Sequence, residues 1–105
     1  MSKRVGKLPL LRFAVQNKAS SGLITGAQLR AARAFLKLSQ KELSALSKVS
    51  NLTIVRMEAT EGPVTRRAKL LASIVAILSR RGIRFFSSGR FGEGVLLEHR
   101  RRRRH

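Results

Sequence analysis

The chain has no cysteine, no tryptophan and no tyrosine, and its only aromatic residues are five phenylalanines. The absence of cysteine excludes disulfides, thiol chemistry and cysteine-ligated zinc sites. With so few aromatic side chains, the base stacking that single-strand and RNA-binding modules use has little to work with. Several classes of protein are therefore disfavoured before any motif is considered.

Histidines and carboxylates are also scarce. His99 and His105 are the only histidines and both lie at the end of the chain, so a histidine-based catalytic or metal site in the folded part is unsupported. The five carboxylates are scattered, at Glu42, Glu58, Glu61, Glu93 and Glu98. Because acid/base catalysis needs groups that act together, we predict that the protein is not an enzyme and needs no cofactor.

Basic residues dominate the charge, with 23 Lys and Arg against five acids and a net charge of +18 in 105 residues. Residues 99–105 include five consecutive arginines and resemble a purification tail altered from polyhistidine; a natural tail, which would add phosphate affinity, is the alternative. Subtracting those five arginines from +18 still leaves +13. The basic balance therefore favours a nucleic-acid partner with or without the tail.

Residues 1–22 form a basic stretch that contains no carboxylate. Its apolar run, residues 8–15, is interrupted by Pro9 and Arg12 and is too short for a membrane span, so we expect no membrane association. We interpret the stretch as a flexible arm that is either only solvated or reaches a nucleic-acid backbone or minor groove. A mitochondrial transit peptide is a further alternative.

Three helix starts carry the same local signature. Thr25 with Gln28, and Ser39 with Glu42, have the spacing of a capping box, and Ser50 is a third N-cap residue. Apolar pairs are placed as hydrophobic staples at the same three points: Ile24 with Leu29, Leu38 with Leu43, and Val49 with Ile54. These signals predict that helices begin directly after residues 25, 39 and 50.

The second and third of these helices are short and are joined by a break at residues 47–49. Their predicted inward faces consist of Leu43 and Leu46, then Ile54 and Met57. Asn51, Leu52, Val55 and Arg56 would then lie on other faces. Helices of this length are unstable alone and must pack against other elements.

The C-terminal part predicts one longer helix and a hairpin. Helical spacing of Leu71, Ile74, Val75 and Leu78 indicates a helix over residues 65–81 that ends before Gly82. Two apolar, β-prone runs separated by glycines predict a β-hairpin over residues 82–98. Because so small a hairpin is unstable alone, it should either cap its own helix or pair its edge with a second copy.

The segment over residues 38–58 resembles the helix-turn-helix of the Xre and Cro-like family, the fold of the lambda-type phage repressors. The resemblance implies a mainly α fold: a lambda repressor-like DNA-binding bundle of about four helices over residues 23–81, followed by the hairpin. It also implies an ion pair between Arg33 and Glu58. Lys48 stands where the family's turn usually has glycine, and a left-handed backbone there would cost about 1 kcal/mol.

The same resemblance implies that the helix starting near Ser50 enters the major groove of double-stranded DNA. The implied base contacts are Asn51 to adenine, Leu52 to a thymine methyl, Arg56 to guanine, and Ser50. Alternatively, Ser50 is only a cap, Leu52 a core residue and Arg56 a phosphate-facing charge. The resemblance assigns a phosphate contact to Gln40. The flanking cations Lys41, Lys48, Arg66 and Arg67 are further candidates for phosphate contacts, and each could equally be a solvated charge.

We therefore expect a bacterial transcriptional regulator that acts in the cytoplasm at the nucleoid. A homodimer on two half-sites is expected, because one short helix reads too few bases for useful specificity. One alternative is an antitoxin-type regulator whose hairpin, with Phe85 and Phe86, also holds a protein partner. The other is a nonspecific basic nucleic-acid-binding protein, for which the charge alone suffices.

Overall fold

Four helices and a three-stranded sheet make up the described part of this computed structural model, which comprises residues 14–15, 24–88 and 92–99. The helices are α2 (Gly26–Phe35), α3 (Gln40–Ser47), α4 (Asn51–Glu58) and α5 (Ala68–Arg80). The strands are β1 (Ala14–Val15), β2 (Ile83–Ser88) and β3 (Gly92–Leu97). The predicted mainly helical fold with a C-terminal hairpin is confirmed.

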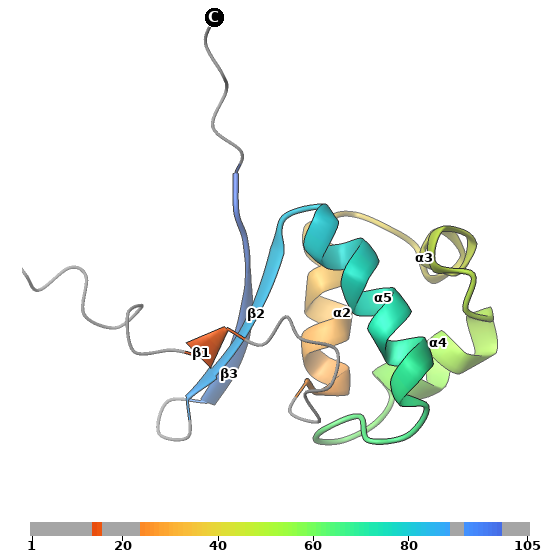
Figure 1. Ribbon diagram of the computed structural model, residues 1–105, viewed down its shortest axis with the longest axis horizontal. Coiled ribbons are helices and arrows are strands. Elements are labelled where there is room, and N and C mark those ends of the chain that lie inside the picture. Colours follow the sequence, from red (N-terminus) through yellow and green to blue (C-terminus); the bar gives the residue numbers. More distant parts are fainter. Residues whose placement is uncertain (1–13, 16–23, 89–91, 100–105) are drawn as a thin grey trace, which may run out of the picture.

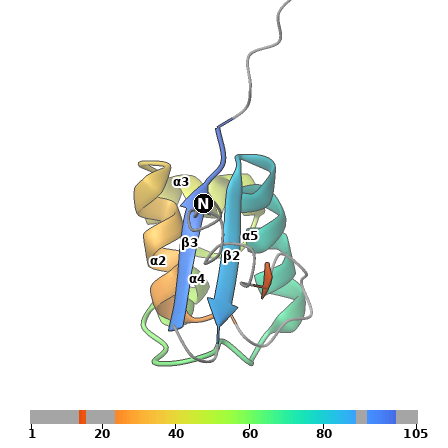
Figure 2. The same ribbon diagram turned by 90° about the vertical axis from the view of Figure 1, so that its left-hand side faces the viewer.

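The helices α2 and α5 form the middle layer. The sheet lies against one side of this pair, and α3 and α4 lie on the other side (Figure 1). A view onto the sheet shows α2 and α5 behind β3 and β2 (Figure 2). The strands are antiparallel in the order β1-β2-β3. The exposed side of α4 is therefore on the far side of the molecule from the sheet.

Two residues of the expected arm take part in the sheet. Ala14 pairs with Ser87 and Val15 with Phe86, so β1 covers part of one edge of β2. The predicted two-stranded hairpin is thus extended to three strands. The other residues of the expected arm, and residues 100–105 of the arginine-rich tail, lie outside the described part of the chain.

The three predicted helix starts are confirmed. Thr25 and Ser39 form complete capping boxes with Gln28 and Glu42, and α2 and α3 begin at the next residue. The hydroxyl of Ser50 caps α4 in the same position. Because each cap joins groups three residues apart, it can be recognised in the local sequence.

The helix α5 begins later than predicted. Its N-cap residue, Arg67, has a left-handed backbone with φ of 56°, and its side chain makes no capping hydrogen bond. A residue in this conformation does not continue a right-handed helix, so α5 starts at Ala68 and not at residue 65. The four predicted inward residues are nevertheless all buried: Leu71, Ile74, Val75 and Leu78.

One predicted core position of α3 is wrong. Leu43 is fully buried, but Leu46 is 37% exposed. The buried residue one turn beyond Leu43 is Ser47, whose hydroxyl donates to the Leu43 carbonyl at 2.8 Å. Positions three and four beyond Leu43 both lie near its side of the helix. Packing of α3 against α4 and α5 buries the fourth position, Ser47, and leaves the third, Leu46, exposed.

The hairpin is attached to its own helices through the core and through Gln28. The buried side-chain amide of Gln28 donates to the carbonyls of Phe86 and Gly94, at 2.9 Å each, and its oxygen accepts from the N–H of Thr25 at 2.9 Å. The hydroxyl of Thr25 donates to the Glu93 carboxylate at 2.7 Å. Both polar atoms of this buried amide are hydrogen-bonded, which compensates the cost of removing them from water, and Gln28 thereby holds both strands on α2.

Candidate nucleic-acid interface

Hydrogen bonds fix the three-residue connection between α3 and α4. Lys48 has a left-handed backbone, with φ of 64° and ψ of 24°, and its N–H donates to the Ser44 carbonyl at 2.8 Å. The Ser44 hydroxyl donates to the Val49 carbonyl at 2.6 Å. The connection therefore adopts the conformation that favours glycine, although Lys48 occupies it.

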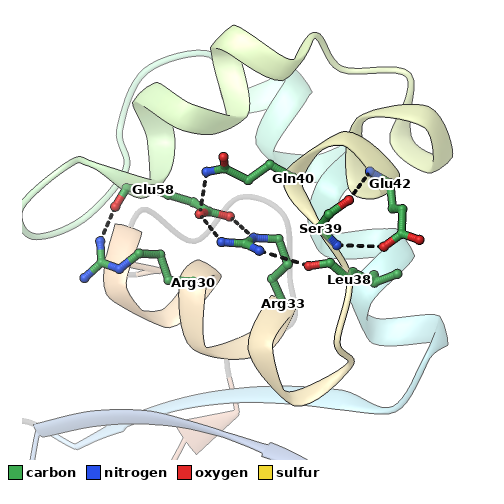
Figure 3. A network of polar contacts seen from close by, with 7 residues as sticks. All are labelled: Arg30, Arg33, Leu38, Ser39, Gln40, Glu42 and Glu58. Carbon is green, nitrogen blue, oxygen red and sulfur yellow. Dashed lines mark hydrogen bonds and ion pairs between the residues drawn. The ribbon is translucent and has the colours of Figure 1, made fainter.

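The carboxylate of Glu58, the last residue of α4, joins three helices (Figure 3). It accepts from Arg33 of α2 at 2.8 and 3.0 Å, and from the amide of Gln40 of α3 at 3.0 Å. Arg33 also donates to the Leu38 carbonyl at 2.9 Å, and Arg30 donates to the main-chain carbonyl of Glu58. The ion pair that the resemblance implies between Arg33 and Glu58 is therefore present.

This pair is well shielded from water, with side-chain exposures of 22% for Arg33 and 3% for Glu58. Hydrogen bonding to Glu58 raises the pKa of the Arg33 guanidinium, while desolvation by burial opposes that change. An arginine is protonated at any physiological pH, so Arg33 is the charged partner in this pair. The pair fixes α4 against α2, and it removes the only carboxylate of α4 from the surface.

The outer surface of α4 combines polar, apolar and cationic side chains. Asn51, Leu52, Val55 and Arg56 are all exposed, whereas Ile54 and Met57 are buried as predicted. Leu52 is 56% exposed, which contradicts the alternative that it belongs to the core. The helix thus presents donors, an acceptor and aliphatic groups on its free side, with no carboxylate among them.

The hydroxyl of Ser50 is used within the cap of α4. It accepts from the N–H of Thr53 at 3.2 Å and donates to the Thr53 hydroxyl at 2.9 Å. The capping role of Ser50 is therefore present, and its contact with a base stays a prediction.

Gln40 is half-buried at the start of α3. Its side-chain nitrogen donates to Glu58, so one of the two amide hydrogens is used in a hydrogen bond inside the protein. A phosphate contact by Gln40 would use the second hydrogen. Glu58 orients the amide that the resemblance assigns to the DNA backbone.

Exposed cations lie on both sides of α4 in the chain. Lys41 and Lys48 belong to α3 and the turn after it, and Arg66 and Arg67 precede α5. A pocket of about 360 Å³ is lined by Arg56, Arg66 and Arg67 together. The fold thus brings three of the predicted DNA-contacting residues to one place, and the two lysines are not part of that pocket.

Comparisons of this chain with protein-family models, with curated proteins and with solved structures gave no match. In residues 14–15, 24–88 and 92–99, no three His, Cys, Asp or Glu side chains come together as a metal site would require. No helix in those same ranges is long and apolar enough to cross a membrane.

Some residues of this surface were not singled out from the sequence. Thr53 and Thr60 line the pocket that also contains Arg56, Arg66 and Arg67. A signal for them exists, since residues three and four places from Arg56 lie near its side of a helix. The sequence did not show, however, that the loop before α5 returns to this side.

Proposed function

We propose that this protein is a sequence-specific double-stranded DNA-binding transcriptional regulator that presents α4 to the major groove. The observation that carries the proposal is the surface of α4. Asn51, Leu52 and Arg56 are exposed there, while the carboxylate of Glu58 is buried against Arg33. A short helix of this composition suits base edges, which offer acceptors, donors and thymine methyls in a strongly negative groove.

The resemblance to the Xre and Cro-like helix-turn-helix family supports the same proposal and suggests a lambda repressor-like fold. The features of this chain that fit the resemblance include two short helices joined by a three-residue connection, and the ion pair between Arg33 and Glu58. Under this proposal α3 lies across the DNA backbone and α4 enters the groove. The protein would act at the nucleoid, in the bacterial cytoplasm.

Phosphate contacts supply the affinity in this mechanism, and base contacts supply the specificity. Lys41, Lys48, Arg66 and Arg67 neutralise phosphates on the two sides of the groove. Asn51 makes a bidentate contact to adenine, and Arg56 contacts guanine or a phosphate.

We also propose that two copies bind together on two half-sites. The outer edge of β3 pairs with no described strand, and the neighbouring outer face of the sheet carries Phe86 and Leu96, both half-buried. Pairing of two β3 edges across a two-fold axis would satisfy this edge. A truncation that removes the hairpin would also remove Ile83 and Phe85 from the core and so could unfold the protein. The substitution Leu96→Glu on the outer face of the sheet is therefore the suitable test of dimerisation. A full-length protein that is monomeric by light scattering at high micromolar concentration contradicts this arrangement.

Selection of binding sites from random duplex DNA tests the central proposal. We expect a preferred sequence, and an affinity that falls with salt at a slope of about 0.9 per phosphate contact. Asn51→Ala should lose about 1–3 kcal/mol at one base position and relax the preference there. Lys69→Ala, an exposed cation on the first turn of α5, is the control for nonspecific loss of charge.

A variant that ends after His99 is the control for the arginine-rich tail. If the salt dependence disappeared with the tail, the folded domain would contribute little to binding. If no sequence were preferred over any other, the protein would be a nonspecific binder. If both Asn51→Ala and Arg56→Ala left the DNA-binding curve unchanged, α4 would not be part of the DNA interface.

A further inference from the structure

Two aliphatic side chains lie next to each other on the outer surface of α4, and of these Leu52 is assigned to a thymine methyl by the resemblance, whereas Val55 has no role in the mechanism above. Leu52 and Val55 are 56% and 36% exposed, although the core of the described chain buries most large aliphatic residues. They are three residues apart, so they are neighbours on the helix surface. They lie between Asn51 and Arg56 in the same eight-residue helix. Single exposed apolar residues are common, but an adjacent pair in the middle of a candidate recognition surface indicates a contact.

The charges around this pair decide which partner fits. Arg56 of α4 and Lys48, four residues before Leu52, are exposed cations, and Arg66 and Arg67 share a pocket with Arg56. The one carboxylate of α4 is buried. An apolar pair with exposed cations on the same part of the chain suits a ligand that is apolar at the contact and anionic around it. The thymine C5-methyl group in the major groove is such a ligand, because phosphates flank it on both sides.

We infer that Leu52 and Val55 are specificity-determining residues that read two thymine methyl groups; this inference rests on the proposed function. Residues three apart on a helix have Cβ atoms about 5–6 Å apart. Successive base pairs are about 3.4 Å apart along the duplex. The two side chains therefore span one to two base-pair steps, and the selected site should contain two thymines at that spacing. Asn51 and Arg56 read the polar edges next to them.

Replacement of thymine by deoxyuridine isolates this contact, because it removes the methyl group and keeps every hydrogen-bonding group of the base. Each thymine of the selected duplex is replaced in turn. We expect about a fourfold loss of affinity at each of two positions, which corresponds to burial of one methyl group, and about fifteenfold when both are replaced. All other thymines should tolerate the change.

Protein variants then assign each methyl to a residue. Leu52→Ala should abolish the difference between thymine and deoxyuridine at one position, and Val55→Ala at the other. Leu46→Ala is the matched control, since Leu46 is an exposed leucine on α3, and it should keep both differences. Both α4 positions are exposed, so their alanine variants should unfold near the wild-type temperature, which circular dichroism checks.

The outcomes separate this inference from the proposed function. If random-duplex selection yields no preferred sequence, the proposed function itself fails. If a preferred sequence exists but binds equally well with deoxyuridine at every position, the methyl reading is overturned. It is also overturned if Leu52→Ala and Val55→Ala leave the deoxyuridine effects unchanged.

Discussion

Replacing Glu58 by glutamine tests whether the buried ion pair fixes α4 in place. The glutamine side chain has nearly the same shape but carries no charge and has a single acceptor oxygen. Glu58 accepts three side-chain hydrogen bonds, two from Arg33 and one from Gln40. In the variant, the amide N–H group would face N–H donors of Arg33 or Gln40, and the guanidinium would lose its counter-charge.

The expected cost follows from burial. Breaking a buried ion pair by removing one partner costs about 3–5 kcal/mol. Arg33 is 22% exposed, so water compensates part of that loss, and we expect about 2–4 kcal/mol for Glu58→Gln. The matched control is Glu98→Gln, which breaks a pair with Arg84 of the same 2.8 Å length but with side-chain exposures of 36% and 56%. That change should cost about 0.2–1 kcal/mol.

Urea unfolding measured by circular dichroism is the suitable assay, because the chain has no tryptophan or tyrosine for fluorescence. The midpoint should fall for Glu58→Gln with an unchanged slope. Combining Arg33→Met with Glu58→Met should cost less than the sum of the two single changes, because the pair is removed as a unit. If Glu58→Gln were no more destabilising than Glu98→Gln, the network would not be what holds α4.

Two further predictions concern single backbone positions. Lys48→Gly should stabilise the protein by about 1 kcal/mol, because Lys48 has φ of 64°; Lys48→Ala keeps a Cβ atom and should give no such gain in the urea midpoint. Gly26→Ala should destabilise by about 1–3 kcal/mol or more, because a Cβ atom there would lie 2.5 Å from the Thr60 carbonyl oxygen and 2.6 Å from that of Met57. Gly62→Ala is the control: a Cβ atom there would meet no atom within 4 Å, but the backbone has φ of 86°, so the change should cost only about 1 kcal/mol. If Gly26→Ala were no more destabilising than Gly62→Ala, the close approach of α2 to α4 would be contradicted.

The features that local interactions decide could be predicted from the sequence. The caps at Thr25, Ser39 and Ser50 join groups three residues apart, so the starts of three helices follow from the sequence alone. The inward residues of α5 follow from the helical repeat because that helix is long enough to define one side. The pairing of Arg33 with Glu58 came from the resemblance, since no rule of spacing joins residues so far apart in the chain.

Only the tertiary structure decided the features that depend on distant neighbours. The helix α3 has two turns, so packing and not pattern determined that Ser47 is buried and Leu46 exposed. No local signal indicates that Gln28 donates to two strands that lie about 60 residues later in the chain. The placement of Arg56 beside Arg66 likewise depends on the loop between α4 and α5. In each case a contact between segments distant in sequence selected one of several arrangements that the local sequence permits equally.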